Sequence, residues 1–329
     1  MKKRSVVNIL IILAILGIGI YRYRTRHFTE SSTRILMGTI VEISLTSKMT
    51  NTADILDKTF EVMSEYDKKF SYYNPEGYLW AINNSNKRES DIDSEFYELL
   101  KIAEEYHEKT DGMYDVTIGA LSDLWGGGRT YPPPADSISS ALSLTGFKKL
   151  SFTENTLSKP IGMKINFGSI AKGYIVDKCV EYALANGVEY GMINAGGDIR
   201  IFGEHKKANN VGIRHPRSPD TLIDVLQVTE GAVVTSGDYE RYFEYKGKKY
   251  HHIISPKDGY PVDYIVSVTI LAPTATQADV LATSVFLMHP DEGIELIKSI
   301  KGAEGILFYF DDDELVSLKT TGIRDYLKD

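Results

Sequence analysis

Strand-like segments that follow one another over short connections fill the second half of this 329-residue chain. They lie at Gly191–Ala195, Val211–Arg214, Val225–Val228, Val233–Thr235, Tyr250–Ile254 and Ser267–Ala272. A parallel pair of strands needs a long crossover, so short connections favour antiparallel pairing. Because helical segments lie on both sides of this region, the sequence predicts a mixed α+β fold with largely antiparallel sheets and packed helices.

The remaining elements are expected from apolar periodicity. A first strand is predicted over Leu36–Leu45, and others over Met163–Phe167, Gly305–Tyr309 and Glu314–Leu318. Apolar residues at three- and four-residue spacing predict helices over Asp54–Phe70, Ser94–Thr110, Ile170–Asn186, Thr276–Met288 and Asp291–Ile300.

Charge and cysteine content exclude several classes of protein. The charged residues among the first 26 are all basic, so the rest of the chain carries 31 basic and 45 acidic residues, a formal charge of −14. This acidic body argues against nucleic acid as the partner. The single cysteine, Cys179, excludes an intrachain disulfide and a cysteine-based zinc site, and its helical surroundings predict a buried, inert thiol.

The N-terminus is predicted to be a separate element. Lys2, Lys3 and Arg4 precede an apolar run from Val6 to Tyr21, and no small-residue cleavage site follows it. We expect an uncleaved signal-anchor over residues 1–26, a polar linker over 27–34 and a single folded domain over 35–329 on the extracytoplasmic side of the cell membrane. Basic residues on both sides of the run leave the orientation open.

One late segment places two oxygen ligands on a single helical face. Asp279 and Thr283 are four residues apart in an apolar helical run, so their side chains should lie side by side. A buried carboxylate is costly unless it is paired or binds a cation, and oxygen ligands suit Mg²⁺. The alternative is an Asp near the helix start and a Thr that bonds back to its own helix.

Glycine- and aspartate-rich turns carry the other candidate chemistry. Residues 166–173 follow a predicted strand and open a helix, which suits an anion such as a phosphate, with Lys172 adding a positive charge. An ordinary strand-to-helix turn explains the same pattern. Residues 194–198, with Gly196 and Gly197, form a second glycine turn directly after a strand, and turn chemistry alone favours a hairpin turn there. In the pair His251 and His252, successive strand side chains point to opposite faces, so at most one faces a site.

Taken in order, these motifs resemble the ApbE family, the FAD:protein FMN transferases. The resemblance runs from Met37 to the closing strands, through Met37-Gly38-Thr39, Asp111-Gly112-Met113-Tyr114-Asp115-Val116-Thr117-Ile118-Gly119, Leu124-Trp125-Gly126, Ala171-Lys172-Gly173-Tyr174, Asn194-Ala195-Gly196-Gly197-Asp198, Ser236-Gly237-Asp238-Tyr239, His252-Ile253-Ile254 and Ala278-Asp279 with Ala282-Thr283. It implies a two-lobed, T-fold-like single domain.

The resemblance also implies a Mg²⁺-dependent reaction and a set of site residues. FAD would be split at its pyrophosphate, FMN joined through a phosphoester to a Thr or Ser of an acceptor protein, and AMP released. The implied metal ligands are Asp279, Thr283 and the Ala171 carbonyl. The implied flavin and pyrophosphate contacts are Met37, Tyr73, Met113, Tyr114, Asp115, Asn166, Lys172, Gly196, Gly197 and Ile254.

Several roles stay open at this point. Asp238 and His252 are both candidates for the general base, and a structural hydrogen bond is as good an account of His252. The family pattern has Asp where this chain has Ser255, commonly Arg-Thr-Gly where it has Lys257-Asp258-Gly259, and commonly Ser where it has Gly77. Two alternatives to the transferase are an FAD pyrophosphatase that releases FMN and AMP, and a non-enzymatic membrane-anchored flavin-binding protein.

The acceptor is expected to be another protein. The resemblance implies a membrane or exported electron-transfer protein with an Asp-x-x-Ser/Thr-Gly-Ala-Thr-like motif, and this chain carries no such motif of its own.

Overall fold

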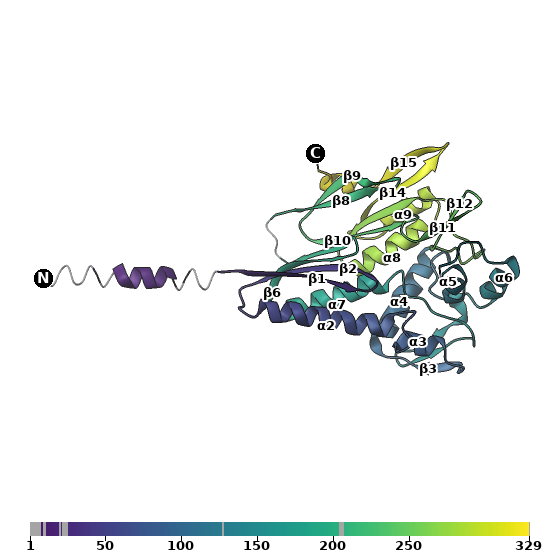
Figure 1. Cartoon of the computed structure of the whole chain (residues 1–329), viewed down its shortest axis with the longest axis horizontal. Helices are drawn as coiled ribbons and strands as arrows, with labels where there is room; N and C mark the ends of the chain where they lie inside the picture. The colour runs from purple at the N-terminus through teal and green to yellow at the C-terminus, as the bar shows by residue number, and fades with distance from the viewer. Residues whose placement is uncertain are drawn as a thin grey trace.

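An eight-stranded antiparallel sheet organises the body of the protein (Figure 1). The computed structural model describes residues 8, 11–19, 21, 26–126, 128–203 and 207–328. The strand order is β1-β2-β6-β7-β10-β13-β14-β15, and every neighbouring pair is antiparallel. The strands span β1 (Phe28–Leu36), β2 (Thr39–Ser47), β6 (Val188–Ala195), β7 (Asp198–Gly203), β10 (Gly231–Gly237), β13 (Ser267–Ala272), β14 (Glu304–Asp311) and β15 (Glu314–Lys319). The predicted mixed α+β class with antiparallel pairing is confirmed.

Helices cover one face of this sheet. In β2, Val41, Ile43 and Leu45 are fully buried on that face, whereas Glu42 between them is exposed. Each fully buried aliphatic side chain of this kind contributes roughly 1.5–3 kcal/mol. The helices packed into the same core include α2 (Thr52–Phe70), α7 (Ala171–Ala185), α8 (Ala275–Phe286) and α9 (Pro290–Ser299).

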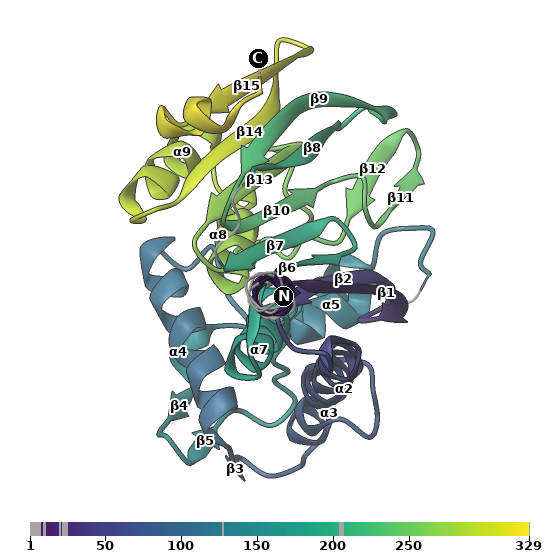
Figure 2. The same cartoon turned by 90° about the vertical axis from the view of Figure 1, so that its left-hand side faces the viewer.

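The opposite face is covered by a hairpin and a short helical turn. β8 (Asn209–His215) pairs with β9 (Ser218–Val228), and the 3-10 helix η2 (Gly322–Tyr326) lies beside them. Their buried side chains meet those of the central strands in a second apolar cluster. Figure 2, turned by 90°, shows β8 and β9 as a separate layer from α7 and α2.

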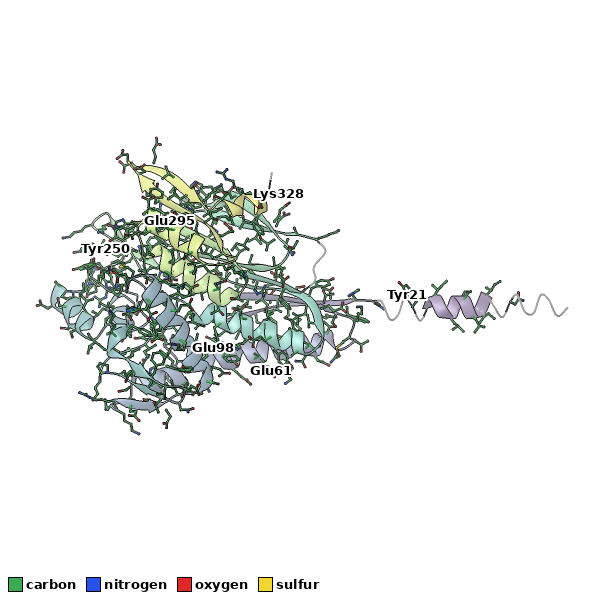
Figure 3. The ribbon with its side chains drawn as sticks, turned by 180° about the vertical axis from the view of Figure 1, so that it is seen from behind. Tyr21, Glu61, Glu98, Tyr250, Glu295 and Lys328 are labelled. Atoms are coloured by element: carbon green, nitrogen blue, oxygen red, sulfur yellow. The ribbon has the colours of Figure 1, made fainter. Side chains whose placement is uncertain are left out.

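The rest of the chain forms a smaller, mainly helical region at one end of the sheet. It contains α3 (Tyr78–Asn83), α4 (Ser94–Lys109), α5 (Gly119–Trp125), α6 (Ala135–Ser143), η1 (Phe147–Lys149) and a small sheet of β3 (Glu89–Asp91), β5 (Thr156–Ser158) and β4 (Ser151–Phe152). A further hairpin, β11 (Tyr242–Tyr245) with β12 (Lys248–His251), stacks Phe243 and Tyr250 on Trp125. Figure 3 shows Tyr250 at the end of the molecule opposite the N-terminal helix.

Two expectations about local structure are wrong. Phe28–Leu36, which covers most of the expected linker, is strand β1, paired with β2 from Phe28↔Ser47 to Leu36↔Thr39. Its residues are mostly polar because it is an edge strand with both faces largely exposed. Met163–Phe167 is not a strand either, since its pairing is limited to an isolated bridge between Lys164 and Ile118.

The predicted membrane anchor falls partly on residues that lie outside the description. These are residues 1–7, 9–10, 20 and 22–25. Among the residues that the structure does describe, no helix combines the length and apolar character needed to cross a membrane.

Candidate active site

A turn at Asn166–Ile170 leads directly into helix α7, which begins at Ala171. The Asn166 Oδ1 accepts a hydrogen bond from the Gly168 N–H at 2.8 Å. The Ile170 and Ala171 N–H groups both donate to the Phe167 carbonyl, at 3.0 and 2.7 Å. The chain therefore turns sharply into a helix whose first residue is Ala171.

Helix α8 crosses this helix start and brings Asp279 to it. The Asp279 side chain is buried, and its Oδ2 accepts a hydrogen bond from the Gly173 N–H at 2.9 Å. A Cβ at Gly173 would overlap the Ala275 carbonyl, so only glycine permits this close approach. Thr283, half-buried, follows Asp279 by one turn of the same helix, as the sequence predicted.

Lys172 forms an ion pair with Asp198, the first residue of β7. Asp198 directly follows the turn formed by Gly196 and Gly197, whose φ angles of +68° and +102° favour glycine. A Cβ at Gly196 would also overlap the Thr39 side chain of β2. The two glycines thus let the β6–β7 turn pass close to β2 while placing Asp198 against Lys172.

The β1–β2 turn lies beside the β6–β7 turn. The Gly196 N–H donates to the Ile40 carbonyl at 2.9 Å, which links the two turns. Met37 adopts a φ of 52°, and its N–H donates to Asp67 Oδ2 at 3.0 Å. The structure therefore places Met37, Gly196, Gly197 and Lys172 in one region.

Negative charge exceeds positive charge around Asp279. The pKa of its carboxyl is raised to about 7, first by burial and then by the charge of Asp198, while the Lys172 ammonium opposes the shift. Glu240, on the chain after β10, adds to the same effect. Burial also raises the pKa of Asp198, although Lys172 opposes it. Asp279 and Asp198 thus share Lys172, while Glu240 lies close to Arg241 and Arg214 as well, so the surplus of negative charge is centred on Asp279 and Asp198.

The oxygen donors near Asp279 fit a hard cation such as Mg²⁺. Among the described residues no group of three or more His, Cys, Asp or Glu side chains is arranged for a metal ion. The predicted ligands are instead one carboxylate, one hydroxyl and the Ala171 carbonyl, a mixed set that Mg²⁺ accepts because substrate and water oxygens complete its shell. The hydrogen bonding of Asp279 is compatible with this, since within the described chain only Gly173 donates to its carboxylate.

Tyr114 and Asp115 support the site from within the core. Tyr114 is 1% exposed, and its hydroxyl accepts a hydrogen bond from Ser169 Oγ at 2.9 Å. The Asp115 carboxylate accepts bonds from the Thr117 N–H, the Thr117 hydroxyl and the Phe147 N–H at 2.8, 2.6 and 2.9 Å. Because its oxygens are occupied in this way, Asp115 has a structural role, and its geometry does not support the predicted contact with the flavin.

The other residues predicted to contact the flavin differ in how far their side chains are exposed and free of hydrogen bonds. Tyr73 is 67% exposed and is free to contact a planar ligand, and Met113 is half-buried. Both ends of the Asn166 side-chain amide are hydrogen-bonded within the protein. Its Nδ2 donates to Ser122 Oγ at 3.0 Å, and its Oδ1 accepts from the Gly168 N–H. Ile254 is 2% exposed and packs with Trp125, so its side chain belongs to the core beneath the site.

The two candidate bases are clearly separated by their partners. Asp238 is buried, and its two oxygens accept hydrogen bonds from Arg217 Nη1 and Nη2 at 2.7 and 2.6 Å. Both oxygens of this carboxylate are therefore occupied by one guanidinium group. We therefore withdraw Asp238 as a candidate base and assign it to anchoring the β8–β9 hairpin.

His252 retains a free ring nitrogen. Its Nδ1 lies 3.3 Å from the Arg241 carbonyl, which can only accept, so Nδ1 carries the proton and Nε2 is an acceptor. Desolvation by the surrounding protein, followed by the Arg241 cation, lowers the pKa of His252 to about 4, so the ring is neutral near pH 7. The ring of His251 instead bonds the Val262 carbonyl at 2.6 Å in the core, which confirms that the two histidines face different ways.

The departures from the family pattern at Ser255 and Gly77 have local physical reasons. The buried Ser255 hydroxyl accepts from the Lys257 and Asp258 N–H groups at 3.2 and 3.4 Å, the turn-capping role that an Asp also performs. A Cβ at Gly77 would lie 2.6 Å from the Lys68 carbonyl, so a serine does not fit this backbone.

Sequence reasoning missed two charged residues of the site. In the sequence Asp198 only ends the 194–198 turn, and Glu240 follows the Ser236–Tyr239 motif with no predicted role. Their role depends on which lysine they face, and residues 172, 198 and 240 meet only through the tertiary fold. In the sequence, the one indication of their role is that each acid lies close to a glycine-containing turn.

Comparison with known proteins gives a consistent result. A sequence model of the ApbE family matches residues 37–307. The FAD:protein FMN transferase of Treponema pallidum (strain Nichols) is 30% identical, covering 95% of this chain and 92% of its own. That of Klebsiella pneumoniae (strain 342) is 29% identical, covering 87% and 91%.

Solved structures agree with these sequence matches. The ApbE protein of Thermotoga maritima superposes with a TM-score of 0.82 at 33% identity, covering 92% of this chain and all of its own. The flavin transferase ApbE of Vibrio cholerae gives the same TM-score at 24% identity, a likeness of fold.

Proposed function

The chain belongs to the ApbE family and is an FAD:protein FMN transferase, and on that premise we propose how its site carries out the transfer. The reaction depends on Mg²⁺, splits the FAD pyrophosphate, joins FMN by a phosphoester bond to a Thr or Ser of an acceptor protein and releases AMP. The observation that carries this proposal is the buried Asp279 carboxylate, held against the N-terminus of α7 in a region with surplus negative charge.

The metal site is proposed at Asp279, Thr283 and the Ala171 carbonyl. When bound there, Mg²⁺ supplies charge neutralisation to the diphosphate of FAD. Cleavage of a phosphoanhydride requires this neutralisation and correct positioning more than covalent help from the protein. Asp279 is suited to the role because a nearby cation, Lys172, lowers the pKa of its carboxyl and so favours the ionised form. The positive end of the α7 helix dipole also favours anionic oxygens.

Lys172 is proposed to exchange partners during the reaction. In the structure its ammonium is paired with Asp198. A diphosphate at the α7 N-terminus offers a second anionic partner close to the same ammonium. Lys172 would then bind and orient the phosphate, with Asp198 limiting the positions that its side chain can adopt.

His252 is proposed as the general base for the acceptor hydroxyl. The acceptor oxygen forms a bond to the phosphorus of the FMN half, and the bond from that phosphorus to the bridging oxygen breaks. AMP leaves with the bridging oxygen. The hydroxyl proton passes to Nε2 of His252, the ring nitrogen that has no hydrogen-bond partner among the described residues.

We also propose that the enzyme is anchored in the cell membrane by its N-terminal segment, with the catalytic domain on the extracytoplasmic side. In the described part of that segment, Ile11, Leu13 and Ile15 are 52%, 59% and 63% exposed, which is the state of an apolar helix that does not pack on the body. The acceptor would then be a membrane or exported electron-transfer protein with an Asp-x-x-Ser/Thr-Gly-Ala-Thr-like motif.

Mass spectrometry of an acceptor peptide tests the proposal directly. The full-length enzyme is incubated with FAD, Mg²⁺ and a peptide carrying the motif. We expect the peptide to gain the mass of one FMN moiety, AMP to appear in equal amount, and both products to be lost on chelation. The exposed Asp291→Asn variant on α9 serves as the matched control and should retain activity.

The alternatives give different products in the same assay. Free FMN and AMP with an unmodified peptide would assign the site to FAD hydrolysis. An equal, background rate of FAD turnover in wild type and Asp279→Asn would instead point to flavin binding without catalysis.

A further inference from the structure

Helices α7 and α8 cap each other's N-termini. Asp177 of α7 accepts hydrogen bonds from the Ala275 N–H at 3.0 Å, the Thr276 N–H at 2.7 Å and the Thr276 hydroxyl at 2.6 Å. In return, Asp279 of α8 accepts from the Gly173 N–H in the first turn of α7 at 2.9 Å. Each helix therefore supplies a carboxylate to the amides that open the other.

Asp177 is needed because the cap of α8 itself is incomplete. The four N–H groups that open a helix have no partner within the helix. In α8, the Thr274 hydroxyl accepts one of them, from Gln277 at 3.2 Å, and the first bond within the helix runs from the Ala278 N–H to the Thr274 carbonyl at 3.1 Å. Among the described residues, the N–H groups of Ala275 and Thr276 have Asp177 as their partner. The start of α8 is thus tied to another helix as well as to its own capping residue.

Asp177 is itself held by the sheet. Its Oδ1 lies 3.5 Å from Nε of the buried Arg200 in β7. Asp198, two residues earlier and therefore on the same face of β7, pairs with Lys172. Helix α7 is consequently fixed to β7 by two charge pairs of opposite polarity, Lys172 with Asp198 and Asp177 with Arg200.

We propose that Asp177 is a positioning residue for the metal site. It does not touch the ion; it sets the distance between the start of α8 and the start of α7, and therefore how closely Asp279 and Thr283 approach Ala171. The missing side chain of Gly173 shows that the two helices are already at their closest approach. Mg²⁺ demands near-ideal octahedral geometry, so a small shift of α8 would weaken binding. This inference rests on the Mg²⁺ site of the proposed function.

Direct binding of Mn²⁺ tests this role independently of catalysis. The full-length protein is titrated with Mn²⁺ as the probe, and free ion is measured by electron paramagnetic resonance. We expect Asp177→Asn to raise the Kd for Mn²⁺ by about 10- to 100-fold, the usual effect of removing a group that orients a metal ligand.

The matched control is Asp93→Asn. Asp93 also accepts an N–H at a helix start, that of Phe96 in α4 at 2.9 Å, and pairs with a cation, Lys69, at 2.6 Å. Its loss should lower stability in a comparable way and leave the Kd for Mn²⁺ unchanged. An equal rise in both variants would show that general destabilisation, and not positioning, controls the affinity.

A milder variant keeps the test decisive if Asp177→Asn folds poorly. Thr276→Val removes one of the three hydrogen bonds to Asp177 and preserves the shape of the side chain. We expect a rise in Kd of roughly fivefold, corresponding to one hydrogen bond. Unchanged affinity in both Asp177→Asn and Thr276→Val would overturn the inference while leaving the metal site intact. Failure of the wild type to bind Mn²⁺ would overturn the metal site and the inference together.

Discussion

Asp115 and Asp279 are both buried carboxylates, 6% and 5% exposed, but their surroundings differ. Asp115 accepts three hydrogen bonds and ties the turn after α4 to Phe147. Asp279 accepts one, from Gly173, and lies near two other acids. A buried charge that the protein satisfies stabilises the fold, whereas one that it leaves undersatisfied is costly unless a ligand completes it. The comparison therefore separates a structural carboxylate from a functional one.

The largest effect is expected for Asp279→Asn. If the Asp279 carboxylate binds a cation and does not stabilise the fold, replacing it with the amide of Asn should lower the rate of FMN transfer by about 10³-fold. Loss of a major electrostatic group has an effect of this size. The free energy of unfolding at pH 8 without Mg²⁺ should stay the same or rise, because the variant removes a charge whose burial raises the pKa to about 7.

Single-turnover transfer assays and urea denaturation measure these two quantities. A large loss of stability together with retained transfer would break the comparison, because it would make Asp279 structural.

His252 extends the comparison to a group that is satisfied on one side only. Its Nδ1 is bonded to the Arg241 carbonyl and its Nε2 is free. His252→Asn retains a donor near that carbonyl but loses the free ring nitrogen. We expect transfer to fall by about 10²-fold, the lower range for loss of general base catalysis, with little change in the affinity for FAD.

Measuring kcat for transfer and the Kd for FAD in the same variant tests this assignment. Partial rescue of transfer by added imidazole would support the role as a base. An unchanged kcat would return His252 to a structural role.

Asp115→Asn should show the opposite pattern to Asp279→Asn. The amide cannot accept at both of its ends, so the buried Phe147 N–H or the Thr117 groups lose a partner, at a cost of about 1–3 kcal/mol in the free energy of unfolding. Transfer activity per folded molecule should remain near the wild-type value. Chemical denaturation and activity corrected for the folded fraction provide the measurement, and a selective loss of FAD affinity would restore the predicted flavin contact.

The sequence predicted the Asp279 and Thr283 pair because its signal is local. Their i, i+4 spacing in an apolar run is a property of one helix, and helix α8 contains both residues. The long amphipathic helices α2 and α4 were predictable for the same reason, and their observed bounds differ by no more than two residues from those expected.

Strand β7 shows where local signals fail. Its buried face carries Asp198 and Arg200, so the expected apolar alternation is absent. Those charges are acceptable there only because Lys172 and Asp177 arrive from α7 with the opposite sign. Edge strand β1 was not predicted because few of its side chains are buried, so its sequence lacks an apolar pattern. The strand is held by backbone pairing with β2.

Asp115 and Asp238 illustrate a related limit for the site. The resemblance placed both near the ligand, and residue type alone does not distinguish a free carboxylate from an occupied one. The partners that occupy them, Phe147 and Arg217, are 32 and 21 residues away in the chain. Only the folded structure reveals that these oxygens are already committed.

The smallest expected effect is a pH dependence of metal affinity that belongs to Asp279 and not to Asp115. The folded-state pKa of Asp279, about 7, lies above the reference value of 3.8, so between these values the folded protein holds a proton that the unfolded chain has lost. This carboxyl therefore lowers the stability of the folded protein progressively as pH rises toward 7.

A cation needs the ionised form of Asp279 and competes with that proton. The Kd for the cation should therefore rise by up to about tenfold for each pH unit below 7 and level off above it. Mn²⁺ titrations between pH 5.5 and 8.5 measure this slope, and Asp115→Asn should reproduce it unchanged. A flat profile in the wild type would mean that Asp279 is ionised throughout this range and that the contrast between the two carboxylates is smaller than their hydrogen bonding indicates.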